Sequence, residues 1–313
     1  MRVVSLLPSA TELICAVGGR ADLVGVSHEW DHPPTVIGLP TLTAPRVRLP
    51  SASDAIDRAV REALVDALAI YAVDGEALRA LKPEVLVTQD LCDVCAVSLE
   101  DVACALAPID ADPPTLVSLR PTRLAHVLED VERVGRALGL EAGARACVTS
   151  LQARLDALFE RLSGCDRPGV LTIEWTDPVM IGGTWMPDLV DLAGGRTLVA
   201  TAGEPAPTLD LQALSTLDPD VVVVKACGYD LERGLAEIPV LQRTLPWNWR
   251  AIQTGQLYIA DGNALFNRSG PRLIDSAELL AALLHPERVP ELLARHAPMV
   301  RRVGPDGAVR PVA

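Results

Sequence analysis

The chain has very little lysine and few aromatic side chains. Only two lysines occur among its 313 residues, Lys82 and Lys225, and aromatic residues make up 3% of the composition. The formal net charge is −13, and no block rich in Lys and Arg interrupts the sequence. Nucleic acids and anionic membrane surfaces attract proteins through clustered positive charge, so we expect neither as a partner.

Long apolar runs and export signals are also missing. No apolar run approaches the ~20 residues that a membrane-spanning helix needs, so no membrane insertion is expected. The apolar stretch within MRVVSLLPSATEL is too short for a secretory signal and lacks an A-x-A cleavage site. The seven cysteines are odd in number and do not have the spacing of a disulfide framework, which favours a reducing compartment. We therefore expect a cytoplasmic protein.

Motifs of covalent and metal-dependent catalysis are absent from the sequence. It contains no P-loop, G-x-G-x-x-G, H-E-x-x-H, EF-hand loop or Ser-His-acid spacing. Glu174 and Asp177 lie close together, but a carboxylate pair on one loop is a weak signal for acid–base chemistry when it has no partner. The sequence therefore predicts a protein that is not an enzyme.

Two halves of the sequence resemble each other. Residues 81–92 read LKPEVLVTQDLC and residues 217–228 read LDPDVVVVKACG, each with Leu-x-Pro-acid before four strand-forming residues. Each half also has Gly-Gly-Arg after a helical run, where glycine suits a left-handed helix cap. The runs VLVT and VVVV are continuously apolar, as is typical of parallel strands covered on both faces. We predict an α/β fold with two lobes of similar topology, residues 1–119 and 165–313.

Residues 120–164 predict a helical connector between the lobes. Apolar residues recur at helical spacing from Leu124 to Leu162, with one weak point near Gly139 to Gly143. A helical bridge would limit motion of one lobe against the other. Beyond residue 270 the pattern is helical again, and we expect the last dozen residues to form a loose tail.

Four segments carry a resemblance to a known family. They are SLLPSATEL (5–13), LKPEVLVTQ (81–89), EWTDPVMIGGTWMPDLVDLAGG (174–195) and GNALFNRSGPRLIDSAELLAALLHP (262–286). In this order they resemble the cobalamin-binding branch of the helical-backbone substrate-binding proteins of ABC importers, a family that also includes ferric-siderophore and haem receptors. The resemblance covers nearly the whole chain. It implies two Rossmann-like lobes joined by a long helix, with cobalamin or a related corrinoid in the cleft between them; a ferric chelate or haem is the alternative ligand.

The resemblance also bears on transport. Transport members are exported and dock on a permease through one acidic residue on each lobe. Glu76 matches the position on the first lobe, whereas Gln212 stands where the second lobe would have an acid. Together with the missing signal peptide, this departure brings permease docking into doubt and suggests a cytosolic offshoot of the family.

Five loops follow predicted strands and supply the candidate ligand-binding residues. Ligands of α/β lobes meet the loops beyond the carboxyl ends of the strands. The candidates on these loops are His28, Glu29, Trp30, Gln89, Cys92, Cys95, Glu174, Trp175, Asp177, Trp185, Cys227 and Arg268. The three Trp side chains would offer stacking surfaces to a large flat ligand, and Gln89, Glu174 and Arg268 polar contacts. His28 would be an axial or polar contact of a metal-containing ligand, although a surface-loop His paired to a neighbouring acid is an equally simple interpretation.

The C-x-x-C of Cys92 and Cys95 leaves several interpretations open. A structural zinc site commonly has two such pairs, and here there is one, although His28 or Cys227 could complete a shared site. The surrounding Asp90, Asp93 and Glu100 would raise the pKa of the thiols, which disfavours redox catalysis. Thiols that line the ligand site are the leading hypothesis, and plain loop packing is the simplest alternative. A thiol- or metal-handling protein that uses Cys92, Cys95 and Cys227 is thus a second hypothesis, and a scaffold without a tight ligand is a third.

Overall fold

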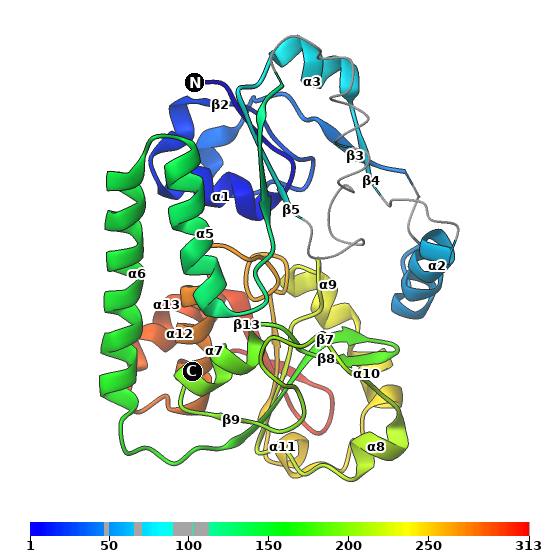
Figure 1. The fold of residues 1–313 in the computed structure, drawn as a ribbon. Helices are drawn as coiled ribbons and strands as arrows, with labels where there is room; N and C mark the ends of the chain where they lie inside the picture. Colours follow the sequence, from blue (N-terminus) through cyan, green and yellow to red (C-terminus); the bar gives the residue numbers. More distant parts are fainter. Residues whose placement is uncertain (47–49, 66–70, 90–101, 103–112, 313) are drawn as a thin grey trace. The chain divides into compact units, whose positions relative to one another are not determined.

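A computed structural model describes residues 1–46, 50–65, 71–89, 102 and 113–312 (Figure 1). The chain divides into two compact units. Unit 1 comprises Met1–Pro121 and Ala125–Leu151, and unit 2 comprises Thr122–Leu124 and Gln152–Ala313. In the part of the chain that the structure describes, no helix combines the length and the hydropathy of a membrane-spanning segment.

Unit 1 contains a four-stranded parallel sheet in the order β2-β1-β5-β6. Its strands are β1 (Val3–Ser5), β2 (Leu23–Gly25), β5 (Val85–Gln89) and β6 (Thr115–Leu119), and the antiparallel pair β3 (Thr43–Pro45) and β4 (Tyr71–Val73) lies apart from them. Its helices are α1 (Pro8–Ala16), α2 (Ser53–Val65), α3 (Gly75–Leu81), α5 (Leu124–Ala137) and the first half of α6 (Glu141–Leu162). Both faces of the sheet are buried, since Val85 and Val87 pack with α1 and α5 while Leu86 packs against Leu42 and Leu78.

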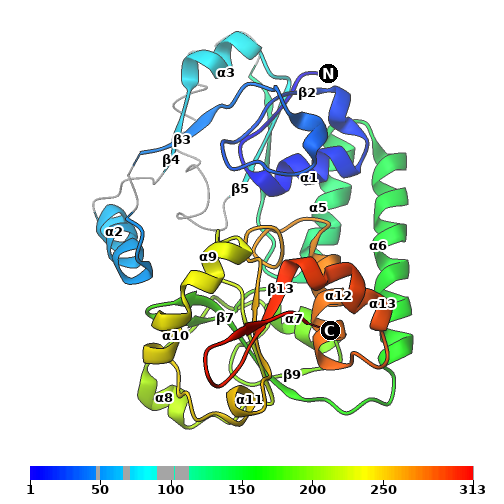
Figure 2. The same ribbon diagram turned by 180° about the vertical axis from the view of Figure 1, so that it is seen from behind.

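Unit 2 contains an eight-stranded sheet in the order β10-β8-β7-β11-β12-β13-β14, with β9 paired to β7. The strands are β7 (Gly169–Thr176), β8 (Val179–Ile181), β9 (Arg196–Thr197), β10 (Thr208–Leu209), β11 (Val221–Val224), β12 (Leu257–Ala260), β13 (Val300–Val303) and β14 (Val309–Arg310). The helices are α7 (Met186–Leu192), α8 (Leu211–Ser215), α9 (Leu231–Ala236), α10 (Ile238–Thr244), α11 (Arg250–Gln253), α12 (Leu273–Leu284) and α13 (Pro290–His296). Within this unit, α8, α10 and α11 cover one face of the sheet, and α7, α12 and α13 lie on the other (Figure 2).

The sequence repeat corresponds to a repeated parallel core. The order β2-β1-β5-β6 of unit 1 matches β9-β7-β11-β12 of unit 2, and the first glycine of each Gly-Gly-Arg has a left-handed backbone, with φ of +98° at Gly18 and +76° at Gly194. Such a conformation favours glycine because it has no Cβ. The predicted class of two Rossmann-like α/β lobes is confirmed. The predicted loose tail is wrong, because β13 and β14 extend the sheet of unit 2 and fully bury Val300 and Val303.

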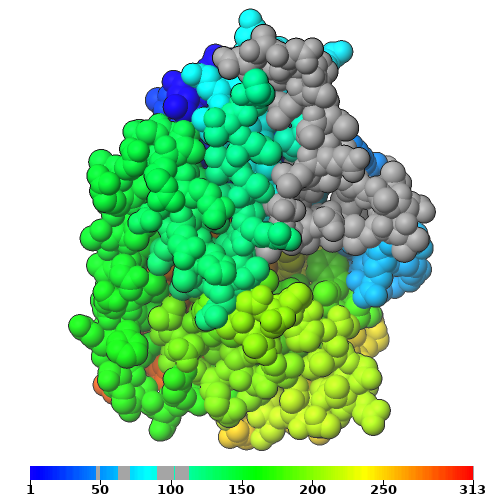
Figure 3. All heavy atoms as spheres, viewed as in Figure 1, coloured from blue at the N-terminus to red at the C-terminus, as the bar shows by residue number. Residues whose placement is uncertain are grey.

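The predicted connector is a pair of helices with a break where glycine was expected to weaken it. Residues 138–140 separate α5 from α6, and Gly139 has a φ of +67°. One helix, α6, belongs to unit 1 up to Leu151 and to unit 2 from Gln152 onward. Its outer side chains are exposed to solvent along its length (Figure 3).

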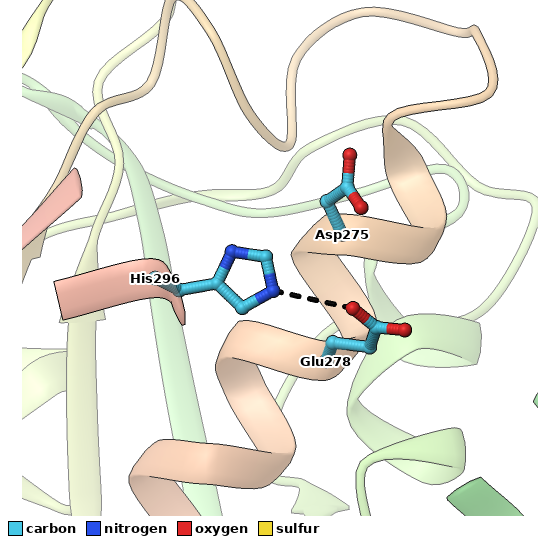
Figure 4. Close-up of side chains that lie close together, drawn as sticks. All are labelled: Asp275, Glu278 and His296. Atoms are coloured by element: carbon cyan, nitrogen blue, oxygen red, sulfur yellow. Dashed lines mark hydrogen bonds and ion pairs between the residues drawn. The ribbon is translucent and has the colours of Figure 1, made fainter. Parts of the chain in front are cut away.

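An ion-pair network fixes the second half of α6 to the terminal helices of unit 2. The Nη2 atom of Arg154 on α6 lies 2.5 Å from Asp275 Oδ1 and 2.8 Å from Glu278 Oε2, both on α12. Glu278 Oε2 also lies 3.2 Å from Arg295 Nη1 on α13. The same oxygen lies 3.2 Å from His296 Nε2 (Figure 4). Burial alone would raise the pKa of Glu278, but hydrogen bonds from His296 and Arg154 outweigh it and lower this pKa to about 2. The carboxylate is therefore charged throughout the physiological range.

Gly143 should tolerate no side chain, because its backbone packs directly on the end of α1. A Cβ at this position would clash with the Val17 carbonyl oxygen. We expect Gly143→Ala to lower the free energy of unfolding by about 1–3 kcal/mol in urea titrations, since the clash outweighs the ~1 kcal/mol that alanine gains in a helix. The exposed Ala142→Ser on the same helix should change it by less than about 0.5 kcal/mol. A Gly143→Ala protein as stable as wild type would contradict this close approach.

Glu278→Gln should destabilise the protein at neutral pH and flatten its acid unfolding. Because the folded-state pKa lies below the ordinary value of 4.5, the carboxylate stabilises the fold above pH 4.5, and this contribution is lost as the pH falls toward 2. We expect the variant to lose about 2–4 kcal/mol at pH 7 in urea unfolding, since Arg154 and His296 lose a buried charged partner. Glu291→Gln removes an exposed partner of Arg161 and should cost less than about 1 kcal/mol. Equal losses in both variants would show that burial of the network is unimportant.

Candidate functional site

A buried lysine joins the end of β7 to the loops that follow β11 and β12; Glu174 lies within β7 and not on a loop as expected. Lys225 follows β11, its side chain is 1% exposed, and its Nζ donates to Glu174 Oε2 at 3.0 Å and to Asn267 Oδ1 at 2.8 Å. Asn267 follows β12 and donates its amide to the carbonyl oxygens of Lys225 and Gly262, both at 2.8 Å. A buried ammonium requires such partners, because an unpaired charge in the interior is costly. The network therefore fixes the ends of β7, β11 and β12 to one another.

Two glycines, Gly182 and Gly262, let the backbone pack closely around Lys225. A Cβ at Gly182 would lie 2.6 Å from Thr172 Oγ1 and 3.3 Å from Lys225 Cε. A Cβ at Gly262 would clash with the Ala226 carbonyl oxygen. The backbone N–H of Gly183 donates to Glu174 Oε2 at 3.3 Å. The lysine is thus enclosed by backbone that approaches too closely for any side chain.

An aromatic pair lies beside the network. The rings of Trp175 and Tyr229 are 5.3 Å apart and tilted by 60°, and the Trp175 indole N–H donates to the Asp177 carbonyl oxygen at 3.1 Å. Arg233 lies over the Tyr229 ring, 4.3 Å from its centroid, and donates to its hydroxyl group at 3.1 Å. Trp175 is thus held in place by contacts of its own, whereas Tyr229 is 5% exposed and offers little surface to a ligand.

The remaining unit 2 candidates differ in their exposure. Trp185 is 8% exposed and its indole N–H donates to the Phe266 carbonyl oxygen at 2.7 Å, so little of this ring is open to a ligand. Asp177 precedes a cis proline and is half-buried. Cys227 is a free, exposed cysteine whose backbone N–H donates to the Glu174 carbonyl oxygen. Arg268 is half-buried and donates to Asn263 Oδ1 at 2.8 Å.

Unit 1 places His28 in a polar cluster centred on Thr43. The Thr43 hydroxyl accepts from the His28 backbone N–H at 2.9 Å, lies 2.7 Å from His28 Nδ1, and donates to Ser27 Oγ at 3.4 Å. The Thr43 hydroxyl and His28 Nδ1 thus share a short hydrogen bond, and this contact fixes the orientation of the imidazole ring. Tyr71 packs 5.0 Å from the imidazole ring and donates to Glu29 Oε1 at 2.8 Å.

The charge state of His28 follows from its partial burial. Burial of the ring lowers the pKa of His28 below the ordinary 6.5, and the nearby Glu29 carboxylate opposes this shift only in part. The imidazole is therefore neutral at pH 7, the form that coordinates metals. Trp30 packs its partly buried ring against the core of unit 1, and Gln89 ends β5 with 8% exposure.

Candidate metal-binding groups lie in two places. Cys92 and Cys95 lie outside the described residues. Among the described residues, Asp275, Glu278 and His296 form the single group of three side chains close enough to share an ion. Arg154 and Arg295 already occupy these carboxylates, so the group is better explained as the structural network described above.

A broad depression of about 710 Å³ lies at the other end of the unit 2 sheet. Its lining includes Pro168, which precedes β7, together with His285 and the Arg288–Cys165 contact of 3.2 Å. Ligands of α/β lobes are expected at the opposite, carboxyl ends of the strands. The depression is therefore not our candidate site.

The two positions compared with permease-docking residues are equivalent in the structure. Asp74 caps α3 by accepting from the backbone N–H groups of Glu76 and Ala77, and Asp210 caps α8 by accepting from that of Ala213. Glu76 and Gln212 are each the second residue of their helix and both are exposed.

Sequence reasoning missed several residues that shape the site. Lys225, Tyr229, Asn267, Thr43 and Tyr71 were not singled out, although all make contacts to predicted site residues. The available signal was the position of Lys225, Tyr229 and Asn267 within the predicted ligand loops. Only two lysines occur in the chain, and one of them directly follows an apolar strand.

Comparison with known proteins agrees with this architecture. A family model described as periplasmic binding protein matches residues 3–264. Over 301 residues the chain is 24% identical to the uncharacterized ABC transporter substrate-binding lipoprotein YvrC of Bacillus subtilis (strain 168), which covers 93% of this chain and 82% of that protein.

Two solved structures show the same fold. A periplasmic heme binding protein from Pseudomonas aeruginosa has a TM-score of 0.68 at 20% identity, over 100% of this chain and 95% of that one. The periplasmic vitamin B12 binding protein BtuF of Vibrio cholerae has a TM-score of 0.63 at 17% identity, over 90% and 96%. At such identities these likenesses concern the fold, whereas the family model spans most of the chain. The chain therefore belongs to the periplasmic binding protein family, whose members are substrate-binding proteins of ABC transporters and not enzymes.

Proposed function

We propose that this protein binds a metal-containing tetrapyrrole non-covalently, and that its ligand is cobalamin or a related corrinoid. The observation that carries this proposal is the half-buried His28, whose Nδ1 lies 2.7 Å from the Thr43 hydroxyl, and we propose that its Nε2 coordinates the metal. A metal-ligating histidine commonly has this arrangement, in which the second ring nitrogen is fixed by a hydrogen bond. Similar folds bind vitamin B12 in Vibrio cholerae and heme in Pseudomonas aeruginosa, which supports a ligand of this class.

Each unit offers candidate contacts of its own near the carboxyl ends of its strands. In unit 1, His28 would coordinate the metal. In unit 2, Trp175, which packs against Tyr229, would contact the ring system, and Glu174 would accept a hydrogen bond from a ligand side arm. The residues proposed to line the site further are Glu29, Trp30, Gln89, Asp177, Cys227 and Arg268. For Trp185 we propose a supporting role, because its ring is buried and bonded to Phe266.

Haem is the second candidate ligand. It is favoured by fold relatives such as the Pseudomonas aeruginosa protein and the periplasmic heme-binding protein RhuT from Roseiflexus sp. RS-1, with a TM-score of 0.67 at 19% identity. His28 would suit its iron as well as cobalt. A cytoplasmic location and the absence of docking on a permease stay predictions.

Absorbance titration tests the proposed ligand class. We expect aquocobalamin to bind with a Kd of about 1 μM or below and a shifted corrin spectrum, as imidazole replaces water on cobalt. Haem in a parallel titration should bind more weakly. The Cys92→Ser/Cys95→Ser variant should retain the shift if the thiols do not hold the metal. Absence of both shift and heat with either ligand would refute the proposal, and loss of the shift in the thiol variant would favour the thiol hypothesis.

The affinity for aquocobalamin should depend on pH through His28. Because the pKa of His28 lies below 6.5, the ring is mainly neutral at pH 7, and binding should be at full strength there. Affinity should fall at lower pH as the imidazole takes up a proton and can no longer coordinate. His28→Gln should weaken binding about tenfold or more and remove this acidic limb, whereas His126→Gln should retain it. An unchanged pH profile in His28→Gln would exclude His28 as the metal contact.

A further inference from the structure

We propose that Glu174 determines the side-arm chemistry of the ligand, favouring arms that carry N–H donors, such as amides, over arms that carry carboxylates. The assignment rests on the corrinoid-binding function proposed above. It concerns only the site at the carboxyl end of the unit 2 sheet, and all residues that carry it belong to that unit.

Glu174 presents an acceptor that is held in place. Its Oε2 accepts from Lys225 Nζ at 3.0 Å and from the Gly183 N–H at 3.3 Å. No partner of Oε1 is recorded among the residues that the structure describes, and the side chain is 25% exposed. An ionised carboxylate can only accept hydrogen bonds. The fixed second oxygen is therefore suited to a ligand N–H.

The Lys225 ammonium group, which carries the positive charge of the network, is not accessible to a ligand. The Lys225 side chain is 1% exposed, and its ammonium group already donates to Glu174 and Asn267. The Lys225 side chain also packs closely on the Gly182 backbone, since a Cβ at Gly182 would lie 3.3 Å from Lys225 Cε. An incoming carboxylate would thus meet the Glu174 oxygen and be repelled, whereas an amide would form a charge-assisted hydrogen bond with it.

Arg268 is the competing determinant in the same region. Its guanidinium group donates to Asn263 Oδ1 at 2.8 Å and is half-buried. If Arg268 dominated recognition, it would pair with an anionic side arm and reverse the preference. The two residues thus predict opposite selectivities for ligands that share one ring system.

Two corrinoids that differ in their side arms provide the test. Cobinamide and cobyrinic acid share the corrin ring and cobalt, but the first carries amides and the second carboxylates. With cyanide on both axial positions, the metal contact is removed and calorimetry reports the side arms. We expect wild type to bind cobinamide more tightly. Glu174→Gln should reduce the ratio of the two Kd values about tenfold or more, equivalent to 1.4 kcal/mol, because the glutamine oxygen can still accept from Lys225 while its NH₂ group becomes a donor.

Glu287→Gln is the matched control. Glu287 is exposed, lines the depression at the amino end of the same sheet, and its substitution changes the net charge equally. Its Kd ratio should equal that of wild type, and urea unfolding should show both variants to be folded. A ratio unchanged in Glu174→Gln, an equal fall in both variants, or a wild-type preference for cobyrinic acid would overturn the role of Glu174. Failure of folded wild type to bind either dicyano-corrinoid or aquocobalamin would instead overturn the proposed function, and this assignment with it.

Discussion

The charge of Lys225 organises the candidate site of unit 2. An ammonium group in the interior costs several kcal/mol unless partners surround it, and here the partners are Glu174 and Asn267, 51 and 42 residues away in the chain. To satisfy one cation, the end of β7 and the loops that follow β11 and β12 must meet. The polar geometry offered to a ligand is thereby determined before any ligand arrives, which lowers the entropic cost of binding.

Unit 1 orients its own candidate residues without a buried ion pair among the residues described here. Thr43 on β3 holds His28 through two contacts, and Tyr71 on β4 packs against the imidazole ring while binding Glu29. The β3–β4 pair, which has no counterpart in unit 2, thus positions the imidazole that we propose as the metal contact. The same parallel core supports an imidazole on one unit and a carboxylate on the other. Duplication of the core does not duplicate the chemistry, because the loops and added strands supply it.

The sequence allowed the repeated core and its connector to be predicted, because their signals are local. Leu-x-Pro before an apolar strand and Gly-Gly-Arg after a helix depend on neighbouring residues only, and glycine at the left-handed positions Gly18 and Gly194 has a backbone reason. The contacts of the site are not local. Nothing near Lys225 in the sequence reveals that Glu174 and Asn267 enclose it, and nothing near Trp185 reveals its bond to Phe266. The tail was mispredicted for the same reason, since Val300 and Val303 become strand residues only through pairing with β12.

The two units have the same kind of residue at the N-caps of α3 and α8 but differ at the second residue of these helices. Asp74 and Asp210 satisfy the free backbone N–H groups at equivalent helix ends, a role worth about 1 kcal/mol that either unit would lose with alanine. The second residue of each helix is exposed, with no such constraint, and there the units differ, with Glu76 in one and Gln212 in the other. The difference therefore cannot be attributed to a different backbone. The two units differ here only in surface charge. A partner that binds a carboxylate on each unit would therefore need a carboxylate at another position of unit 2.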